Sequence, residues 1–286
     1  MSQSRNTLTA RSVLLSVLLG TDPPRLPVRL LVRTTELFGF AEGTVRTALS
    51  RMAAAGEVVA EDGWYALAAD RLLARQARQT ASRAARTRPW PGSEPGSACG
   101  TGGRWIQAVV VATGRRPAGE RAQLRVALAS ARLAELREGV WLRPDNLDAP
   151  WLGAGGDAAT RSADAAEVEV GWPAAGGDIH WFRAVPDGDP ASLAARLWDL
   201  DAWAAAAADL RQRMAGLVDP LAAGDRGALA DGFVLSADVL RHLQADPLLP
   251  ALLLPAGWPG GPLRDEYDRY DAAYRAVLGD WFGEHR

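Results

Sequence analysis

Residues 38–52 of this chain read FGFAEGTVRTALSRM, and this stretch decides how the N-terminal part folds. Its apolar residues recur at i, i+3, i+4 and i+7 and form one helical stripe: Val45, Ala48, Leu49 and Met52. The pattern predicts a helix from about residue 41 to residue 55, with Gly56 at the stop position. A Phe-Gly-Phe turn precedes it, which favours a helix-turn-helix.

The polar side of this helix carries the candidate functional residues. At 100° per residue, the positions opposite or flanking the apolar stripe are Gly43, Thr44, Arg46, Thr47, Ser50 and Arg51. We expect no acid on this outward face. Guanidinium donors and short hydroxyls suit phosphate oxygens and guanine edges in a DNA major groove. The alternative is an ordinary amphipathic helix with a solvated polar face.

The flanking sequence predicts a winged helix-turn-helix. Two helices are expected before the quoted stretch, one capped by Thr9 and ending at Gly20, the other from about residue 27 to residue 37, with a loop at residues 22–27. After it, residues 58–67 read as a hairpin around Asp62-Gly63. A further arginine-rich helix is expected from Asp70 to about Arg88.

Charge divides the chain of 286 residues unevenly. All 32 basic residues are arginine, against 34 acids. Residues 1–88 contain 13 arginines and seven acids, a net charge of +6, whereas the remainder has a net charge of −8. A basic N-terminal module indicates an anionic partner, with a fluctuation in a charge-rich chain as the alternative.

The rest of the chain predicts an α+β protein of three domains. Residues 1–88 form the winged helix-turn-helix with its trailing helix, and residues 89–103 are a Gly/Pro/Ser linker. Residues 104–189 form a central ferredoxin-like domain, with strands at 105–112, 139–143, 168–170 and 179–184 and a helix at 120–136. Residues 190–286 form a helical domain, with helices at 192–217, 228–244 and 263–282.

Composition excludes several kinds of chemistry. The absence of lysine removes a P-loop clamp and Schiff-base catalysis, and the single Cys99 removes disulfides and cysteine-rich zinc sites. The acids lie in loops without pairing, and no nucleophile motif occurs. We therefore expect no catalytic residues, no metal and no cofactor. The short apolar run after Arg11 is followed by neither a cleavage site nor a membrane span, so the expectation is a cytoplasmic protein with no membrane contact.

Four stretches of the chain together resemble the PaaX family, the repressors of phenylacetic-acid catabolism and their relatives. The first runs from Phe38 through Met52 to Gly56. The others are Gly-Val-Trp-Leu-Arg-Pro at 139–144, Leu-Trp-Asp-Leu-Asp at 197–201, and a proline- and tryptophan-punctuated loop at 246–260. Their order matches the family, and they span nearly the whole chain.

The resemblance implies a transcriptional regulator, usually a dimeric repressor, that binds double-stranded operator DNA through its N-terminal winged helix. An effector releases it, which for the archetype is phenylacetyl-CoA. Two features depart from the family: the wing is short and acidic at Glu61-Asp62, where the family commonly carries arginines, and a Gly/Ser insertion surrounds Cys99.

For the effector, an acyl-CoA-like or aromatic ligand, we name four candidate residues: Arg115, Arg116, Trp141 and Arg143. Arginines after a strand can hold phosphates, and tryptophan can line an apolar pocket. Homodimerisation is expected through the C-terminal helices, on the apolar content of residues 248–254 and the alanine-rich segment 203–208. The alternative function is an enzyme or adaptor derived from a DNA-binding protein, acting on an acyl-CoA or nucleic acid through the central domain.

Overall fold

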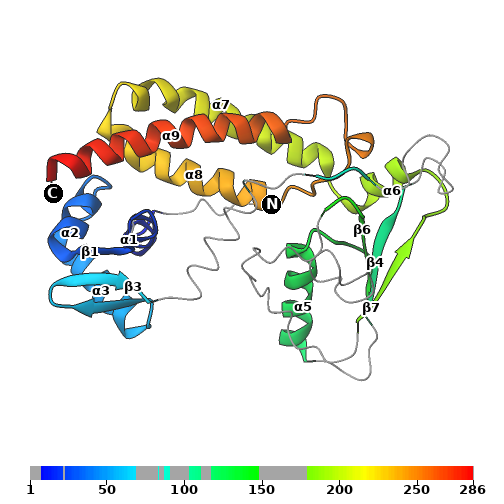
Figure 1. The fold of residues 1–286 in the computed structure, drawn as a ribbon, viewed down its shortest axis with the longest axis horizontal. Coiled ribbons are helices and arrows are strands. Elements are labelled where there is room, and N and C mark those ends of the chain that lie inside the picture. The colour runs from blue at the N-terminus through cyan, green and yellow to red at the C-terminus, as the bar shows by residue number, and fades with distance from the viewer. Residues whose placement is uncertain are drawn as a thin grey trace, which may run out of the picture. The chain divides into compact units, whose positions relative to one another are not determined.

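The computed structural model describes residues 8–21, 23–68, 83, 87–90, 103–110, 117–147 and 179–285. These residues belong to two compact units (Figure 1). The first unit is drawn from residues 1–84, 205–244 and 259–286, and the second from residues 85–204 and 245–258. Helices and strands occur in both units, which confirms the predicted α+β class. The three domain boundaries proposed above stay predictions.

The N-terminal part of the first unit has the element order of a winged helix. Its elements are α1 (Ala10–Leu19), β1 (Arg25–Pro27), α2 (Val28–Glu36), α3 (Glu42–Ala54), β2 (Val58–Glu61) and β3 (Trp64–Leu67). The three strands form one antiparallel sheet in the order β1-β3-β2. All three helices contribute buried side chains to the core: Val13, Leu14, Leu18, Leu31, Val45, Leu49 and Met52.

Strand β1 corrects the loop predicted at residues 22–27. Arg25 pairs with Ala66 and Pro27 with Trp64, so β1 is an edge strand of the small sheet. Prolines made a strand hard to predict here because they lack a backbone N–H. An edge strand tolerates them, since one of its sides forms no hydrogen bonds with another strand. The predicted hairpin is confirmed, and Asp62 (φ 47°) and Gly63 (φ 79°) both adopt the left-handed conformation that such a two-residue turn requires.

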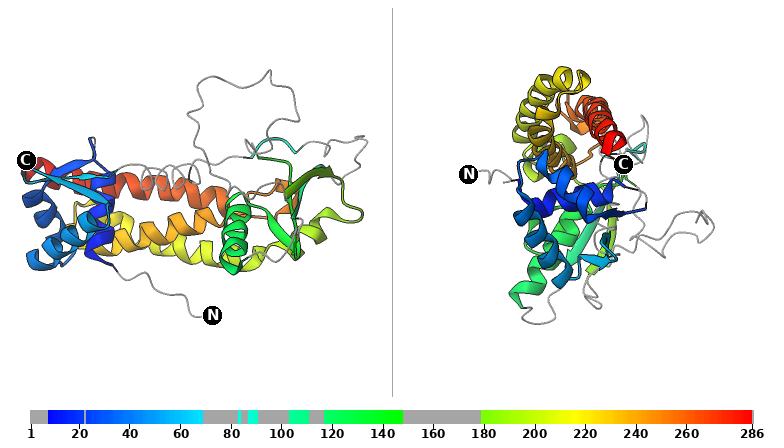
Figure 2. Two further views of the ribbon diagram at one scale, coloured as in Figure 1. Left: turned by 90° about the horizontal axis from the view of Figure 1, so that it is seen from below. Right: turned by 90° about the vertical axis from the view of Figure 1, so that its left-hand side faces the viewer.

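Three long helices complete the first unit, apart from the first five residues of α7, which belong to the second. They are α7 (Leu200–Ala222), α8 (Leu229–Gln244) and α9 (Gly260–His285), with a 3₁₀ turn, η3 (Arg226–Ala228), before α8. They run alongside one another in Figure 1 and in the left-hand view of Figure 2. Helices α8 and α9 approach closely where the Tyr270 hydroxyl donates to the Gly232 carbonyl at 2.6 Å. No helix in the described part of the chain is long and apolar enough to cross a membrane.

The second unit contains a four-stranded antiparallel sheet in the order β5-β6-β4-β7. Its elements are β4 (Trp105–Val110), α5 (Ala118–Ser130), β5 (Ala134–Arg137), β6 (Val140–Pro144) and β7 (Ile179–Ala184). Counted along the chain, the strands lie in the order 2-3-1-4, the arrangement of a ferredoxin-like sheet. The predicted helix at 120–136 is therefore too long, because residues 134–137 are a strand.

Both faces of this sheet carry a core. On one face, α5 packs over a cluster that includes Ala108, Leu128 and Trp141. On the other, Trp90, Trp105 and Leu142 pack with α6 (Pro190–Leu197) and the 3₁₀ turn η4 (Ala251–Leu253). The predicted helix at 192–217 is thus two helices, α6 and α7, separated by an extended Trp198 (φ −130°, ψ 136°).

Some sequence predictions lie outside the described residues. They are the trailing helix at 70–88 apart from a helical Arg83 and residues 87–88, the linker around Cys99, the strand at 168–170, and the effector candidates Arg115 and Arg116.

Candidate nucleic-acid interface

Helix α3 holds its polar side chains in solvent by anchoring its apolar stripe. Val45, Leu49 and Met52 are buried in the winged-helix core. The six predicted DNA-contacting residues are all exposed, and we call this set the reading face: Gly43, Thr44, Arg46, Thr47, Ser50 and Arg51. Because the stripe is fixed by packing, the helix presents the reading face without needing a ligand to order it.

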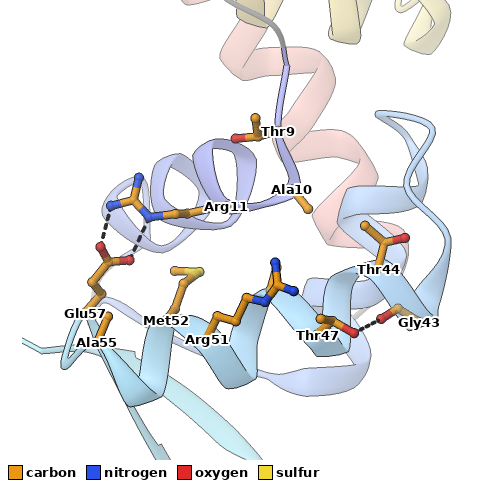
Figure 3. A pocket seen from close by; sticks show the side chains of 11 residues that line it. Thr9, Ala10, Arg11, Gly43, Thr44, Thr47, Arg51, Met52, Ala55 and Glu57 are labelled. Carbon is orange, nitrogen blue, oxygen red and sulfur yellow. Dashed lines mark hydrogen bonds and ion pairs between the residues drawn. The ribbon is translucent and has the colours of Figure 1, made fainter.

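The reading face divides into two stripes. Gly43, Thr44, Thr47 and Arg51 line one wall of an open groove of about 650 Å³, and the N-terminal turn of α1, with Thr9 and Arg11, lines the other (Figure 3). Arg46 and Ser50 lie outside this groove. The Thr47 hydroxyl donates to the Gly43 carbonyl at 2.8 Å, so its oxygen remains available as an acceptor. The groove was not predicted from the sequence.

The groove wall on α1 is held by an ion pair within the winged helix. Arg11 donates from Nε to Glu57 Oε2 at 2.8 Å and from Nη2 to Glu57 Oε1 at 2.5 Å. This hydrogen bonding raises the pKa of Arg11, so its positive charge is secure. The first turn of α1 contains no acid and is capped by Thr9. The groove therefore combines a helix N-terminus and the Arg51 guanidinium, both attractive to an anion, with the Glu57 carboxylate, whose charge Arg11 balances.

The expectation of an acid-free outward face is wrong at the start of α3. Arg46 Nε donates to Glu42 Oε1 at 2.7 Å, and both side chains are mostly exposed. Glu42 and Arg46 are one helical turn apart, so the pair follows from their spacing alone. Glu42 lies within the predicted helix, one turn before Arg46, so its spacing already allowed this pair to be predicted. An exposed pair of this kind is weak, so Arg46 can exchange it for a phosphate or base.

The wing is short and anchored back onto the helix-turn-helix. The Gly63 carbonyl accepts a hydrogen bond from the backbone N–H of Val28 at 2.9 Å, which ties the turn to the start of α2. Glu61 and Asp62 at the wing tip are exposed, and both are acidic. The positive group on this sheet is Arg25, whose guanidinium lies 5.2 Å from the ring centre of Trp64. The acidic wing tip therefore repels an anionic partner, whereas the arginines of α3 and of the groove attract one.

Two effector candidates can be located. Trp141 is buried in the core between the sheet and α5. Arg143 is 1% exposed, and its donors bond to the carbonyls of Pro144 and Ala131 and to the side chain of Asn146. Burial, with smaller repulsion from Arg132, lowers the pKa of Arg143 to about 9. Sequence reasoning missed its more exposed neighbours, Arg104 and Arg183.

In the described residues, no group of three or more His, Cys, Asp or Glu side chains is placed to hold a metal ion.

Comparison with known proteins gives matches at two scales. The model of the PaaX-like protein family matches residues 9–71, which contain α1 to β3. No curated protein matches the chain. A solved structure, the uncharacterized protein Rv0674 from Mycobacterium tuberculosis, is 38% identical, covers 95% of this chain and 100% of its own, and has a TM-score of 0.67.

The family match lies on the winged helix that carries the reading face, and the similarity to the mycobacterial structure extends over nearly the whole chain. Residues 9–71 therefore form a winged helix of the PaaX-like family.

Proposed function

We propose that this chain is a transcriptional repressor that binds operator DNA as a homodimer and is released by a small acyl-CoA-like or aromatic ligand. The observation that carries the proposal is the reading face of α3, whose six residues are all exposed on a helix fixed by a buried stripe. The PaaX-like match over the winged helix supports regulation through DNA, and the chemistry of the reading face supports α3 as the element that binds the DNA.

The two stripes of the reading face suit different tasks. Arg46 projects outside the groove with its terminal amino groups beyond the Glu42 pair, so it is the candidate for reading a guanine edge. Arg51 and Thr47 lie in the groove beside the N-terminal turn of α1, where a phosphate would meet both a guanidinium and a helix N-terminus. We assign base reading to the first stripe and backbone positioning to the second.

The wing contributes little in this proposal. Glu61 and Asp62 would repel DNA phosphates, so we expect affinity to depend on α3 and the α1–α3 groove.

Fewer of the residues expected at the dimer interface are available to a second protomer than the sequence suggested. Leu248, Leu249 and Leu253 are buried within their own unit, as is Trp203, which stacks on Trp258 with ring centres 4.6 Å apart. Of the segment 248–254, Ala251 and Leu252 remain exposed. A helix-turn-helix dimer places its recognition helices about one DNA turn apart, so the operator should be palindromic.

A salt titration of DNA binding tests the proposal. Fluorescence anisotropy with a labelled fragment from upstream of the gene should show affinity falling steeply with salt, with a slope matching about four to six phosphates per protomer. A fragment with its half-sites scrambled is the control for specificity. An affinity independent of salt, or equal for both fragments, would contradict operator binding. Sedimentation at micromolar concentration tests the dimer, which a monomer with and without DNA would exclude.

A further inference from the structure

Three arginines converge on one buried carboxylate at the end of the sheet in the second unit. Arg104 Nε donates to Asp145 Oδ2 at 2.9 Å, Arg183 Nε lies 3.6 Å from the same oxygen, and Arg88 Nη2 donates to Oδ1. Asp145 is 2% exposed. We call these four residues the Asp145 cluster.

Strand register explains the convergence. Trp105 of β4 pairs with Pro144 of β6 on one side and with Ala184 of β7 on the other. The neighbouring residues Arg104, Asp145 and Arg183 therefore meet at this end of three adjacent strands. The backbone N–H of Asp145 also donates to the Arg104 carbonyl at 2.8 Å, which fixes the carboxylate between the two guanidinium groups.

The Asp145 cluster contains more positive charge than its carboxylate neutralises. One arginine would balance Asp145, yet both Arg104 and Arg183 face it, and Arg143 is buried close by with its bonds made to groups within the protein. Arg143 is still protonated at neutral pH, since its lowered pKa is about 9. Like charges held together are costly unless an anion joins them.

In the Asp145 cluster, Arg104 and Arg183 have terminal amino groups that can still donate hydrogen bonds to a ligand. Each turns Nε to Asp145, and neither terminal amino pair has a partner among the described residues. Their side chains are 41% and 53% exposed, so an incoming group can reach them. A guanidinium fork held in place on one edge is prepared to bind an oxyanion with the other.

We propose that Arg104 and Arg183 form a binding site for an oxyanion group, a phosphate or a carboxylate, of the regulator's small-molecule ligand. This inference rests on the proposed function, because it gives the releasing ligand its anchoring point. Asp145 acts as a positioning residue that holds Arg104 by a hydrogen bond and attracts Arg183 as an ion pair. Arg143 is a buried support for the site and not a ligand contact.

The test measures ligand affinity by isothermal titration calorimetry on the full chain. The probes are phenylacetyl-CoA, coenzyme A, phenylacetate and inorganic phosphate. Arg104→Gln/Arg183→Gln should weaken the bound probe about tenfold or more, because two charge-assisted contacts are lost. The matched control is Arg137→Gln, an exposed arginine on β5 at the opposite edge of the same sheet, which should bind like the wild type.

The probes distinguish the source of the oxyanion. Arginine-dependent binding of coenzyme A indicates a phosphate, and arginine-dependent binding of phenylacetate alone indicates a carboxylate. Wild-type binding to none of the probes, or equal affinity in the double variant and the control, would overturn the site. If the double variant melts early, Arg183→Gln alone is the substitute, since its contact to Asp145 is the longest of the three.

DNA binding without ligand keeps this inference separate from the proposed function. The double variant should retain wild-type affinity for the operator fragment and fail to be released by the ligand. If the wild type does not bind the fragment, the proposed function fails, whereas the calorimetry still decides whether the oxyanion site exists.

Discussion

Arginine serves two different purposes in the two units of this molecule. On α3, Arg46 and Arg51 stand on an exposed helix face, and the Arg46 side chain is 60% exposed beside a single exposed acid. In the Asp145 cluster, arginines surround a carboxylate that is almost fully buried. On α3, Arg46 can exchange its weak pair with Glu42 for another partner, whereas removing the buried carboxylate of Asp145 would destabilise the second unit.

The comparison shows why charge alone does not identify a binding residue. Arg143 and Arg46 are the same residue type, and both were selected from the sequence as site residues. The guanidinium of Arg143 donates hydrogen bonds to two backbone carbonyls and to Asn146, whereas Arg46 donates one from Nε to Glu42. Which donors remain available depends on tertiary neighbours, so the structure is needed to separate the two roles.

The largest expected effect comes from the stripe that supports the reading face. Leu49 is fully buried, so Leu49→Ala should lower the free energy of unfolding by about 2–5 kcal/mol through the cavity it leaves. Urea unfolding measures this change, and DNA affinity should fall only as the folded fraction falls. A normal midpoint would show that α3 does not depend on this anchor.

The next largest effect is expected from the buried carboxylate of the Asp145 cluster. Asp145→Asn keeps the shape but leaves three arginines without their carboxylate, and should cost about 2–4 kcal/mol of unfolding free energy, less than a fully buried pair because the arginines are partly solvated. Thermal and urea melts check it. Asp209→Asn is the control, because that carboxylate is exposed and 3.6 Å from Arg213; its change should stay within about 0.5 kcal/mol.

A smaller effect is expected for Arg46→Ala, and it should appear in binding and not in stability. Loss of a bidentate guanine contact should cost about 1–3 kcal/mol of DNA binding and relax preference at one base pair. If Arg46 holds a phosphate instead, the loss should be uniform across sequences and the salt slope should fall by about one. Binding to a set of single-substituted operators distinguishes these outcomes.

The smallest effect concerns the acid beside Arg46. Glu42→Gln removes a negative charge from the edge of the reading face and frees Arg46, so DNA affinity should rise about two- to threefold. Anisotropy at low salt, where surface charges are least screened, is the measurement. Weaker DNA binding in this variant would mean that Glu42 orients Arg46 for its contact.

Much of the winged helix could be predicted because its signals are local. The stripe of α3, the Asp-Gly turn and the Thr9 cap depend on residues within a few positions of one another. Strands β1 and β5 were missed for the opposite reason: β1 contains a proline, and the Ala-Glu-Leu-Arg of β5 favours a helix until pairing with β6 overrides it.

The Asp145 cluster could not be predicted for a related reason. Its members are far apart in sequence, and Arg88 and Asp145 are separated by 57 positions. They meet only when β4, β6 and β7 pair in register, which no local pattern specifies. The α1–α3 groove likewise needs two helices to be packed before it exists. The reading face differs, since one helix brings all six of its residues together.

The most direct test of the account compares DNA affinity for two double variants, Arg46→Ala/Arg51→Ala on α3 and Arg104→Gln/Arg183→Gln in the second unit, each with a melting curve and without ligand. The account predicts that the first stays folded and loses operator affinity by about 2 kcal/mol or more, because two charged contacts are removed. The second should bind DNA like the wild type. Wild-type affinity in a well-folded Arg46→Ala/Arg51→Ala protein would contradict the central claim that α3 binds the operator.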